Sequence, residues 1–263
     1  MSSSGDGGEA RVLGLDLAGV TGSTGYAVLE GAQNPTLTKA GVLPLAKTPV
    51  AAEDDLLQLI DDVAPTRIAI DAPLTLPPCL TCPPYCRGPG AGCELEASRS
   101  MWEVGSNPVI RRQCELKLKE LIPGSDPKPT MGLGVITARA VALMRKLETR
   151  GIPPASASRG EVLEVYPAAT LLRLGHHDRP PREAPADTKA VFYESVIGAL
   201  PSVVSAELSA ICTGSDDAFD AFLSAYTAWL YPGGLEHPPA DFNVASGWIW
   251  FPRPAEPASV LSA

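Results

Sequence analysis

Apolar residues recur along the chain in two different periods, which predict strands in the first part and mostly helices after it. Apolar runs at residues 11–19, 24–31 and 36–46 predict three strands, and the Gly/Thr/Ser turn after the first predicts a hairpin. Pro44 places the third strand at a sheet edge, because proline cannot donate a ladder hydrogen bond. The opening strands therefore predict an antiparallel meander.

Helical spacing of apolar residues begins at residues 51–64, and a buried-looking fourth strand follows at residues 67–74. Later segments predict a helical insert at residues 99–151 and a fifth strand at 161–168. Further helices are predicted at 169–174, 189–200 and 215–231, and a short final strand or aromatic lid at 247–254. This order predicts an α/β protein with a mixed sheet flanked by helices. We expect one domain over residues 11–252, with disordered ends at 1–10 and 253–263.

Carboxylates fall at the positions where the predicted sheet and the last helix would meet. Asp16 lies inside or at the end of the first strand, Asp71 lies at the end of the fourth, and Glu164 lies in the fifth. Asp217 and Asp220 lie in the first turn of the last long helix, where their spacing puts both on one face. Converging carboxylates repel one another without a cation, and such oxygen ligands suit Mg²⁺ or Mn²⁺. The pattern predicts a divalent-metal site of the kind used for phosphodiester hydrolysis.

Each of these acids also has a structural interpretation. Asp16 could form a turn, and Asp71 could simply end a strand before Pro73. Glu164 could pair with a buried arginine. The acids of the last helix could serve only its dipole. The metal-site hypothesis is preferred because the structural account needs all of these coincidences together.

Four cysteines follow the fourth strand inside a Pro/Gly-rich segment at residues 75–98. Such a segment cannot build a helix or a core, so another interaction must order it. Four closely spaced thiolates can form a tetrahedral zinc site. An iron–sulfur cluster, or free or disulfide-linked cysteines, are the alternatives that remain open. The four cysteines are Cys79, Cys82, Cys86 and Cys93, while Cys114 and Cys212 are expected to be small core residues.

The overall charge argues mildly against a whole surface built to bind nucleic acid, since the formal net charge is −9. The charge is uneven, however, because residues 99–150 hold ten of the 21 basic residues but only five of the 30 acidic ones. Within this stretch Arg99, Arg111 and Arg112 are candidate phosphate contacts, although each could equally belong to a solvated helix face.

Several segments in order resemble one known family: "VLGLDLAG", "IAIDAPLTLP", "EVYPAATLL", "DDAFDAFLSAYTA" and "GWIWFP". Together they are similar to the predicted nucleases of domain-of-unknown-function family 429. The resemblance implies a ribonuclease H-like fold with a five-stranded sheet. It also implies metal ligation by Asp16, Asp71 and Glu164, joined by Asp217, Asp220 or both. The segment "DAFDAFLSA" further resembles the last-helix motif of Holliday-junction resolvases.

The preferred hypothesis is thus a metal-dependent nuclease or phosphodiesterase with nucleic acid as partner. The alternatives are an ATPase or phosphotransferase, since "LGLDLAGVTGSTGYAVL" also resembles the phosphate hairpin of actin and sugar kinases, or an inactive zinc-stabilised binding module. No signal peptide or membrane-spanning run is visible, which predicts a cytoplasmic protein without a membrane partner.

Overall fold

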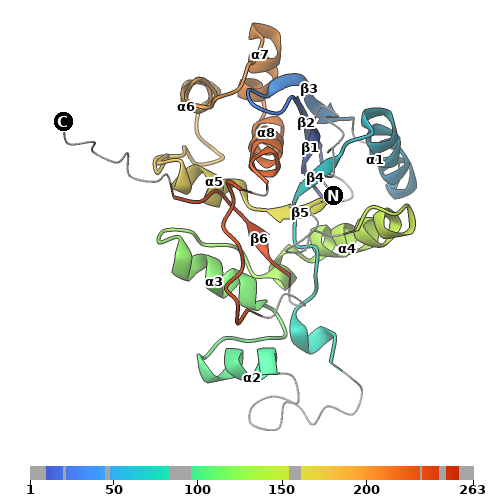
Figure 1. Ribbon diagram of the computed structural model, residues 1–263, viewed down its shortest axis with the longest axis vertical. Coiled ribbons are helices and arrows are strands. Elements are labelled where there is room, and N and C mark those ends of the chain that lie inside the picture. The colour runs from blue at the N-terminus through green and yellow to red at the C-terminus, as the bar shows by residue number, and fades with distance from the viewer. Residues whose placement is uncertain are drawn as a thin grey trace, which may run out of the picture.

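The computed structural model describes residues 10–19, 22–44, 48–82, 96–153, 161–231, 233–242 and 247–254. These residues form a mixed six-stranded sheet in the order β3-β2-β1-β4-β5-β6, with helices on both faces (Figure 1). The strands are β1 (Arg11–Asp16), β2 (Thr24–Glu30), β3 (Thr36–Leu43), β4 (Arg67–Asp71), β5 (Val162–Val165) and β6 (Ile249–Trp250). The helices are α1 (Pro49–Val63), α2 (Glu96–Glu103), α3 (Gln113–Leu121), α4 (Gly134–Thr149), α5 (Pro167–Arg173), α6 (Ala186–Ala199), α7 (Ala206–Gly214) and α8 (Asp216–Trp229).

The predicted meander and the predicted change to parallel strands are both confirmed. β1, β2 and β3 pair antiparallel, and β3 is at the sheet edge as Pro44 indicated. β4 pairs parallel to β1, and β5 and β6 continue in parallel. The prediction of five strands was wrong by one, because Ile249–Trp250 pairs with the outer edge of β5; of the two expectations for this segment, the short final strand is confirmed and the aromatic lid is not.

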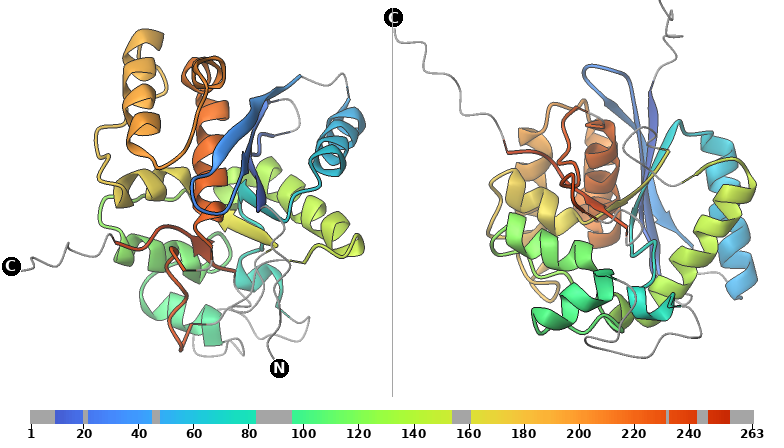
Figure 2. Two further views of the ribbon diagram at one scale, coloured as in Figure 1. Left: turned by 45° about the horizontal axis from the view of Figure 1, so that its top comes forward. Right: turned by 60° about the horizontal axis from the view of Figure 1, so that its bottom comes forward.

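Two layers of helices enclose the sheet, which Figure 2 shows nearly edge-on in its right-hand view. α1 and α4 cover one face, where Leu13, Leu15 and Ile70 are fully buried among their apolar side chains. α8 crosses the other face, packed with α6 and α7 against β2 and β3. α3 and β6 complete that face beside β5. α7 has no counterpart in the sequence prediction.

The alternation of side chains along β1 decides which way its terminal acid points. Leu13 and Leu15 face α1 and α4, so Gly14 and Asp16 face α8. Gly14 lies directly beneath α8, where an added Cβ would come within 2.1 Å of the carbonyl oxygen of Ala221. The strand therefore presents bare backbone to the helix, and α8 lies close enough to bring its first turn next to Asp16.

The expected helical insert lies at the carboxyl ends of the parallel strands. It includes α2 and α3, in the lower part of Figure 1, and the 3₁₀ turn Thr130–Leu133, and it ends with α4, which lies along the sheet face described above. Residues 83–95, which hold Cys86 and Cys93, lie outside the described residues, as do all but residues 10, 253 and 254 of the predicted disordered ends 1–10 and 253–263. Cys114 and Cys212 are 1% and 0% exposed, which confirms that they are core residues.

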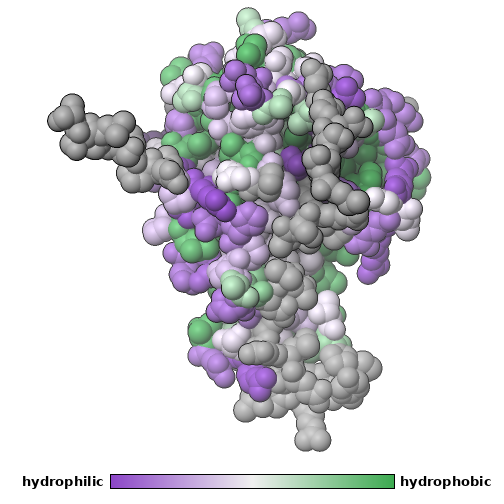
Figure 3. Space-filling view, in the orientation of Figure 1, coloured by the Kyte–Doolittle hydropathy of each residue, from purple (hydrophilic) through white to green (hydrophobic). Residues whose placement is uncertain are grey.

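Across the described residues, no helix combines the length and the apolar character that crossing a bilayer requires. Figure 3 shows hydrophilic and hydrophobic residues interspersed on the described part of one face.

Candidate active site

Two carboxylates stand side by side at the carboxyl ends of the central strands. Asp16 ends β1 and Asp71 ends β4, and the parallel register of the two strands pairs them directly. Both are half-buried, and within the described residues neither carboxylate accepts a hydrogen bond from a side chain or forms an ion pair. The sequence prediction that these two residues meet is confirmed by this register.

The surroundings of this acid pair disfavour negative charge. Burial, and then the charges of Asp220 and Asp217, raise the pKa of Asp16 from 3.8 to about 8. Burial, and then Asp16 and Asp220, raise the pKa of Asp71 well above its usual range. Two adjacent carboxylates can both ionise only when a cation compensates them. The pair is therefore a place where a cation would be stabilised.

The first turn of α8 brings further acids to the pair. Ser215 caps the helix by accepting a hydrogen bond from the Ala218 amide at 3.3 Å. Asp217 and Asp220 follow on the face toward β1 and β2, and Asp217 accepts a short hydrogen bond from the Ser23 hydroxyl. Its own backbone rests on β2, since an added Cβ at Gly25 would come within 2.0 Å of the Asp217 carbonyl oxygen.

Two arginines that the sequence reasoning missed hold these helix acids. Arg179 binds both oxygens of Asp220, with separations of 2.8 and 2.9 Å. Arg182 lies 2.7 Å from Asp217 and 3.6 Å from Asp216. Both come from the Pro-rich segment between α5 and α6, and no sequence pattern links that segment to the first turn of α8.

These side chains line a polar cavity of about 380 Å³, named here the acid hollow. Its lining residues are Asp16, Asp71, Arg179, Pro180, Arg182, Tyr193, Asp216 and Asp220. Tyr193 donates a hydrogen bond from its hydroxyl to Asp216 at 2.9 Å and packs beneath Arg179. The acid hollow thus combines unpaired acids on the sheet with ion-paired acids on α8.

Glu164 takes a different position from the other predicted ligands. It pairs in register with Ile70, so side-chain alternation directs it to the α4 side of the sheet, opposite to Asp16 and Asp71. There it accepts hydrogen bonds from Arg112 at 2.5 and 2.7 Å and from the Leu74 amide at 2.9 Å. This arrangement favours the alternative of a strand glutamate paired with a buried arginine.

The three arginines proposed to contact phosphate do not lie together at the acid pair. Arg112 is only 1% exposed and is also bound to Glu115 at 3.1 Å, so its guanidinium is used inside the protein. Arg111 donates to the Pro127 carbonyl at 3.3 Å. Arg99 is exposed on α2, at the far end of the insert (Figure 1). The positive charges that lower the pKa values of the acid pair are those of Arg179 and Arg182, which the sequence reasoning missed.

The predicted metal ligands have not all converged. Within the described ranges, no three His, Cys, Asp or Glu side chains are arranged to hold a metal ion in the positions they now take. Arg179 occupies the carboxylate of Asp220, which keeps it from joining the pair. Of the predicted zinc ligands, Cys79 and Cys82 are half-buried near the 3₁₀ turn Pro78–Leu80, and the other two lie outside the described residues.

Comparison with known protein families gives a match over most of the chain. A family model described as "Protein of unknown function (DUF429)" matches residues 14–243, a range that holds both acids of the pair and the first turn of α8. No curated protein and no solved structure matches the chain. The match supports the resemblance seen in the sequence and assigns no chemistry.

Proposed function

Because this chain belongs to the DUF429 family, which is described only as proteins of unknown function, we propose its function from its own residues: hydrolysis of nucleic-acid phosphodiester bonds with a bound divalent cation. The observation that carries the proposal is the pair Asp16 and Asp71. The two residues are paired in register and half-buried, and neither carboxylate has a side-chain partner among the described residues. The pKa of each carboxyl is raised. Such a pair fits Mg²⁺ or Mn²⁺, which prefer oxygen ligands.

The strand order supports a finer fold assignment. Three antiparallel strands followed by parallel strands, in the order β3-β2-β1-β4-β5, agree with the ribonuclease H-like fold that the sequence resemblance implies. On this assignment β6 is an addition to the common sheet. The acids at the carboxyl ends of β1 and β4 then occupy the edge where ligands bind in open α/β sheets.

In this proposal some residues of the acid hollow bind the cation and others bind the substrate. Asp16 and Asp71 would hold the cation through their carboxylate oxygens, and the chemistry supplied there would be polarisation of the phosphate and activation of a water. Asp220 can join them once Arg179 releases it, and the freed guanidinium can then bind a phosphate oxygen. Ser23 orients Asp217 beside them. Glu164 acts from the opposite face as a positioning residue, through its ion pair with Arg112.

A cleavage screen with single- and double-stranded DNA and RNA, with Mn²⁺ present or chelated, tests this function. Asp16→Asn should abolish Mn²⁺-dependent cleavage and weaken Mn²⁺ binding measured by electron paramagnetic resonance. Asp54→Asn, which changes an exposed acid on α1, is the matched control and should retain both. Equal cleavage by wild type and Asp16→Asn would contradict the assignment of the site.

For the cysteine segment we propose structural zinc, with an iron–sulfur cluster as the competing outcome. The support is the spacing of the four cysteines together with the free thiol of Cys79, whose sulfur lies 3.5 Å from the Ser98 hydroxyl. Elemental analysis of the purified protein should find zinc, and Cys79→Ser should lower that content. Stoichiometric iron with sulfide would replace zinc, and a metal-free protein would contradict the site.

A further inference from the structure

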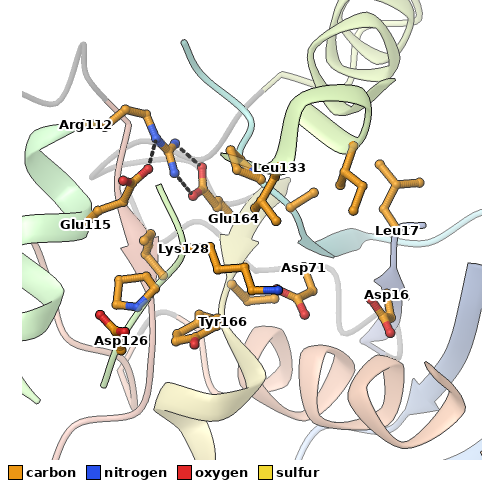
Figure 4. Close-up of a pocket in the computed structure, with 16 residues that line it drawn as sticks. Asp16, Leu17, Asp71, Arg112, Glu115, Asp126, Lys128, Leu133, Glu164 and Tyr166 are labelled. Atoms are coloured by element: carbon orange, nitrogen blue, oxygen red, sulfur yellow. Dashed lines mark hydrogen bonds and ion pairs between the residues drawn. The ribbon is translucent and has the colours of Figure 1, made fainter. Parts of the chain in front are cut away.

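Asp16 and Asp71 line a second cavity, of about 240 Å³, which is named here the lysine hollow. None of its other lining residues is shared with the acid hollow, so the acid pair stands between two separate spaces. Figure 4 shows that its walls come from the ends of β1, β4 and β5 and from the insert. A chain-like substrate that reaches the acid pair from the acid hollow can therefore continue into the lysine hollow.

The lysine hollow contains several carboxylates, but those outside the acid pair already have cations. Glu164 and Glu115 both bind the guanidinium of Arg112, at 2.5 and 3.1 Å. Glu115 also lies 3.9 Å from Arg111, and Asp126 binds a lysine of α3 at 2.6 Å. Once a divalent cation compensates the acid pair, every carboxylate of this hollow is balanced by a positive charge.

Lys128 adds one further positive charge to the wall of the hollow. Within the part of the chain that the structure describes, its ammonium group forms no ion pair and no hydrogen bond. Figure 4 shows the side chain extending across the hollow in the direction of Asp71. Because the ammonium and the Asp71 carboxylate are not in contact, an anion can lie between the lysine and a cation held by the acid pair.

The backbone on both sides of Lys128 is held in place. Pro127 is buried, and its carbonyl accepts a hydrogen bond from Arg111 at 3.3 Å. Thr130 is fully buried, and its amide donates a hydrogen bond to a carboxylate of α3 at 3.2 Å. Pro127 and Pro129 restrict the chain on either side of the lysine, since the proline ring fixes φ. The lysine is thus presented from an ordered segment, which lowers the entropic cost of binding a ligand.

We propose that Lys128 binds the phosphate group next to the scissile one, so that the substrate strand passes from the acid hollow, across the acid pair, into the lysine hollow. This inference rests on the proposed function and narrows its substrate class to chains that carry a further phosphate beside the scissile bond. Lysine binds phosphate as a point charge, which suits a backbone contact without base preference. On the other side of the acid pair, Arg179 and Arg182 lie where the strand would enter.

Chromogenic esters of thymidine test this subsite. One pair is thymidine 5′-(p-nitrophenyl phosphate) with and without a 3′-phosphate, and the other is thymidine 3′-(p-nitrophenyl phosphate) with and without a 5′-phosphate. The two pairs cover both strand directions. With Mn²⁺ present, the added phosphate should raise kcat/KM about tenfold in at least one pair, as a hydrogen bond between charged groups predicts. Lys128→Gln should remove that gain in one pair, whereas Lys39→Gln, which changes an exposed lysine of β3, is the matched control and should retain it.

Binding of an oligonucleotide gives a readout that needs no turnover. Fluorescence anisotropy of a labelled oligothymidylate measures its affinity at several salt concentrations, with Ca²⁺ replacing Mn²⁺ as a cation that prefers oxygen ligands. Each phosphate contact contributes about 0.7 to the slope of log K against log salt concentration for a single strand. Lys128→Gln should reduce the magnitude of this slope by about 0.7, and Lys39→Gln should leave it unchanged.

The results that overturn the lysine subsite differ from failure of the nuclease proposal. Mn²⁺-dependent cleavage that gains nothing from an added phosphate, or gains equally in wild type and Lys128→Gln, would keep the nuclease and refute the subsite. An unchanged salt slope in Lys128→Gln, or no binding of oligothymidylate by the wild type, would also refute it. A reduced slope in the variant, with no ester cleaved by the wild type, would keep phosphate binding at Lys128 and refute the hydrolysis.

Discussion

Replacing Asp16 by Asn removes a charge that the fold disfavours, and this change tests the electrostatics of the acid pair directly. Burial and the neighbouring acids raise the pKa of Asp16 from 3.8 to about 8. At 1.36 kcal/mol per pKa unit, ionising this group in the cation-free protein costs up to ~6 kcal/mol. Relaxation and coupling to Asp71 reduce the figure, so we expect a gain of about 2–3 kcal/mol for the uncharged variant.

The pH dependence has a defined sign. Because the pKa of Asp16 is raised in the folded protein, its contribution to stability is fully present below about pH 4 and is lost as pH rises to about 8. The wild type therefore loses stability across this window, while Asp16→Asn lacks that loss. The stability difference between the two proteins should grow from near zero at pH 4 to its full value at about pH 8.

Urea denaturation and thermal melting over this pH range, with EDTA present, measure the difference. A gain of 2–3 kcal/mol corresponds to about 5–10 °C in Tm for a protein of this size. Asp54→Asn is the control and should follow the wild type. Added Mn²⁺ should stabilise the wild type much more than Asp16→Asn, because the variant has lost a ligand. A variant that is less stable at every pH, or a difference independent of pH, would refute the reasoning.

Three further changes probe the supports of the site. Gly25→Ala places a Cβ within 2.0 Å of the α8 backbone, so it should lower the free energy of unfolding in urea by about 3 kcal/mol and weaken Mn²⁺ binding. Gly198→Ala, with open space around it, is the control and should change neither. Arg112→Met should cost about 3–5 kcal/mol in urea unfolding, and adding Glu164→Gln should recover part of this; no recovery would argue against the ion pair. Arg179→Gln should tighten Mn²⁺ binding about tenfold in a resonance titration, by a charge effect of ~1.4 kcal/mol, and unchanged affinity would contradict a competing role.

The sequence was sufficient to place the acid pair, because its signal is local. Asp16 and Asp71 each lie inside or at the end of an apolar run that predicts a strand, and parallel strands bring their carboxyl ends to one sheet edge. The i, i+3 spacing of Asp217 and Asp220 likewise places both on one face of a helix. Ser215, directly before this turn, belongs to the residue types that favour helix caps, and it accepts the cap hydrogen bond from Ala218.

The remaining features of the site depend on partners that are distant along the chain. Glu164 lies in a strand like the other acids, but its ion pair joins it to Arg112, 52 residues away. The alternation of side chains along a strand would have placed Glu164 and Asp71 on opposite faces of the sheet, but only if the register of β5 against β4 had been known. The contact of Arg179 with Asp220 depends on the path of a loop, which carries no period in the sequence.

The two-residue strand β6 has a consequence for solubility that is separate from chemistry. Without Ile249–Trp250, the outer backbone groups of β5 would form a bare sheet margin able to recruit another chain. Trp248 and Trp250, both at least 90% buried, anchor this short strand against α3 and β5. A shortened chain that ends before residue 247 would thus expose the unpaired edge of β5 and self-associate through it, even though every acidic residue of the acid hollow is still present.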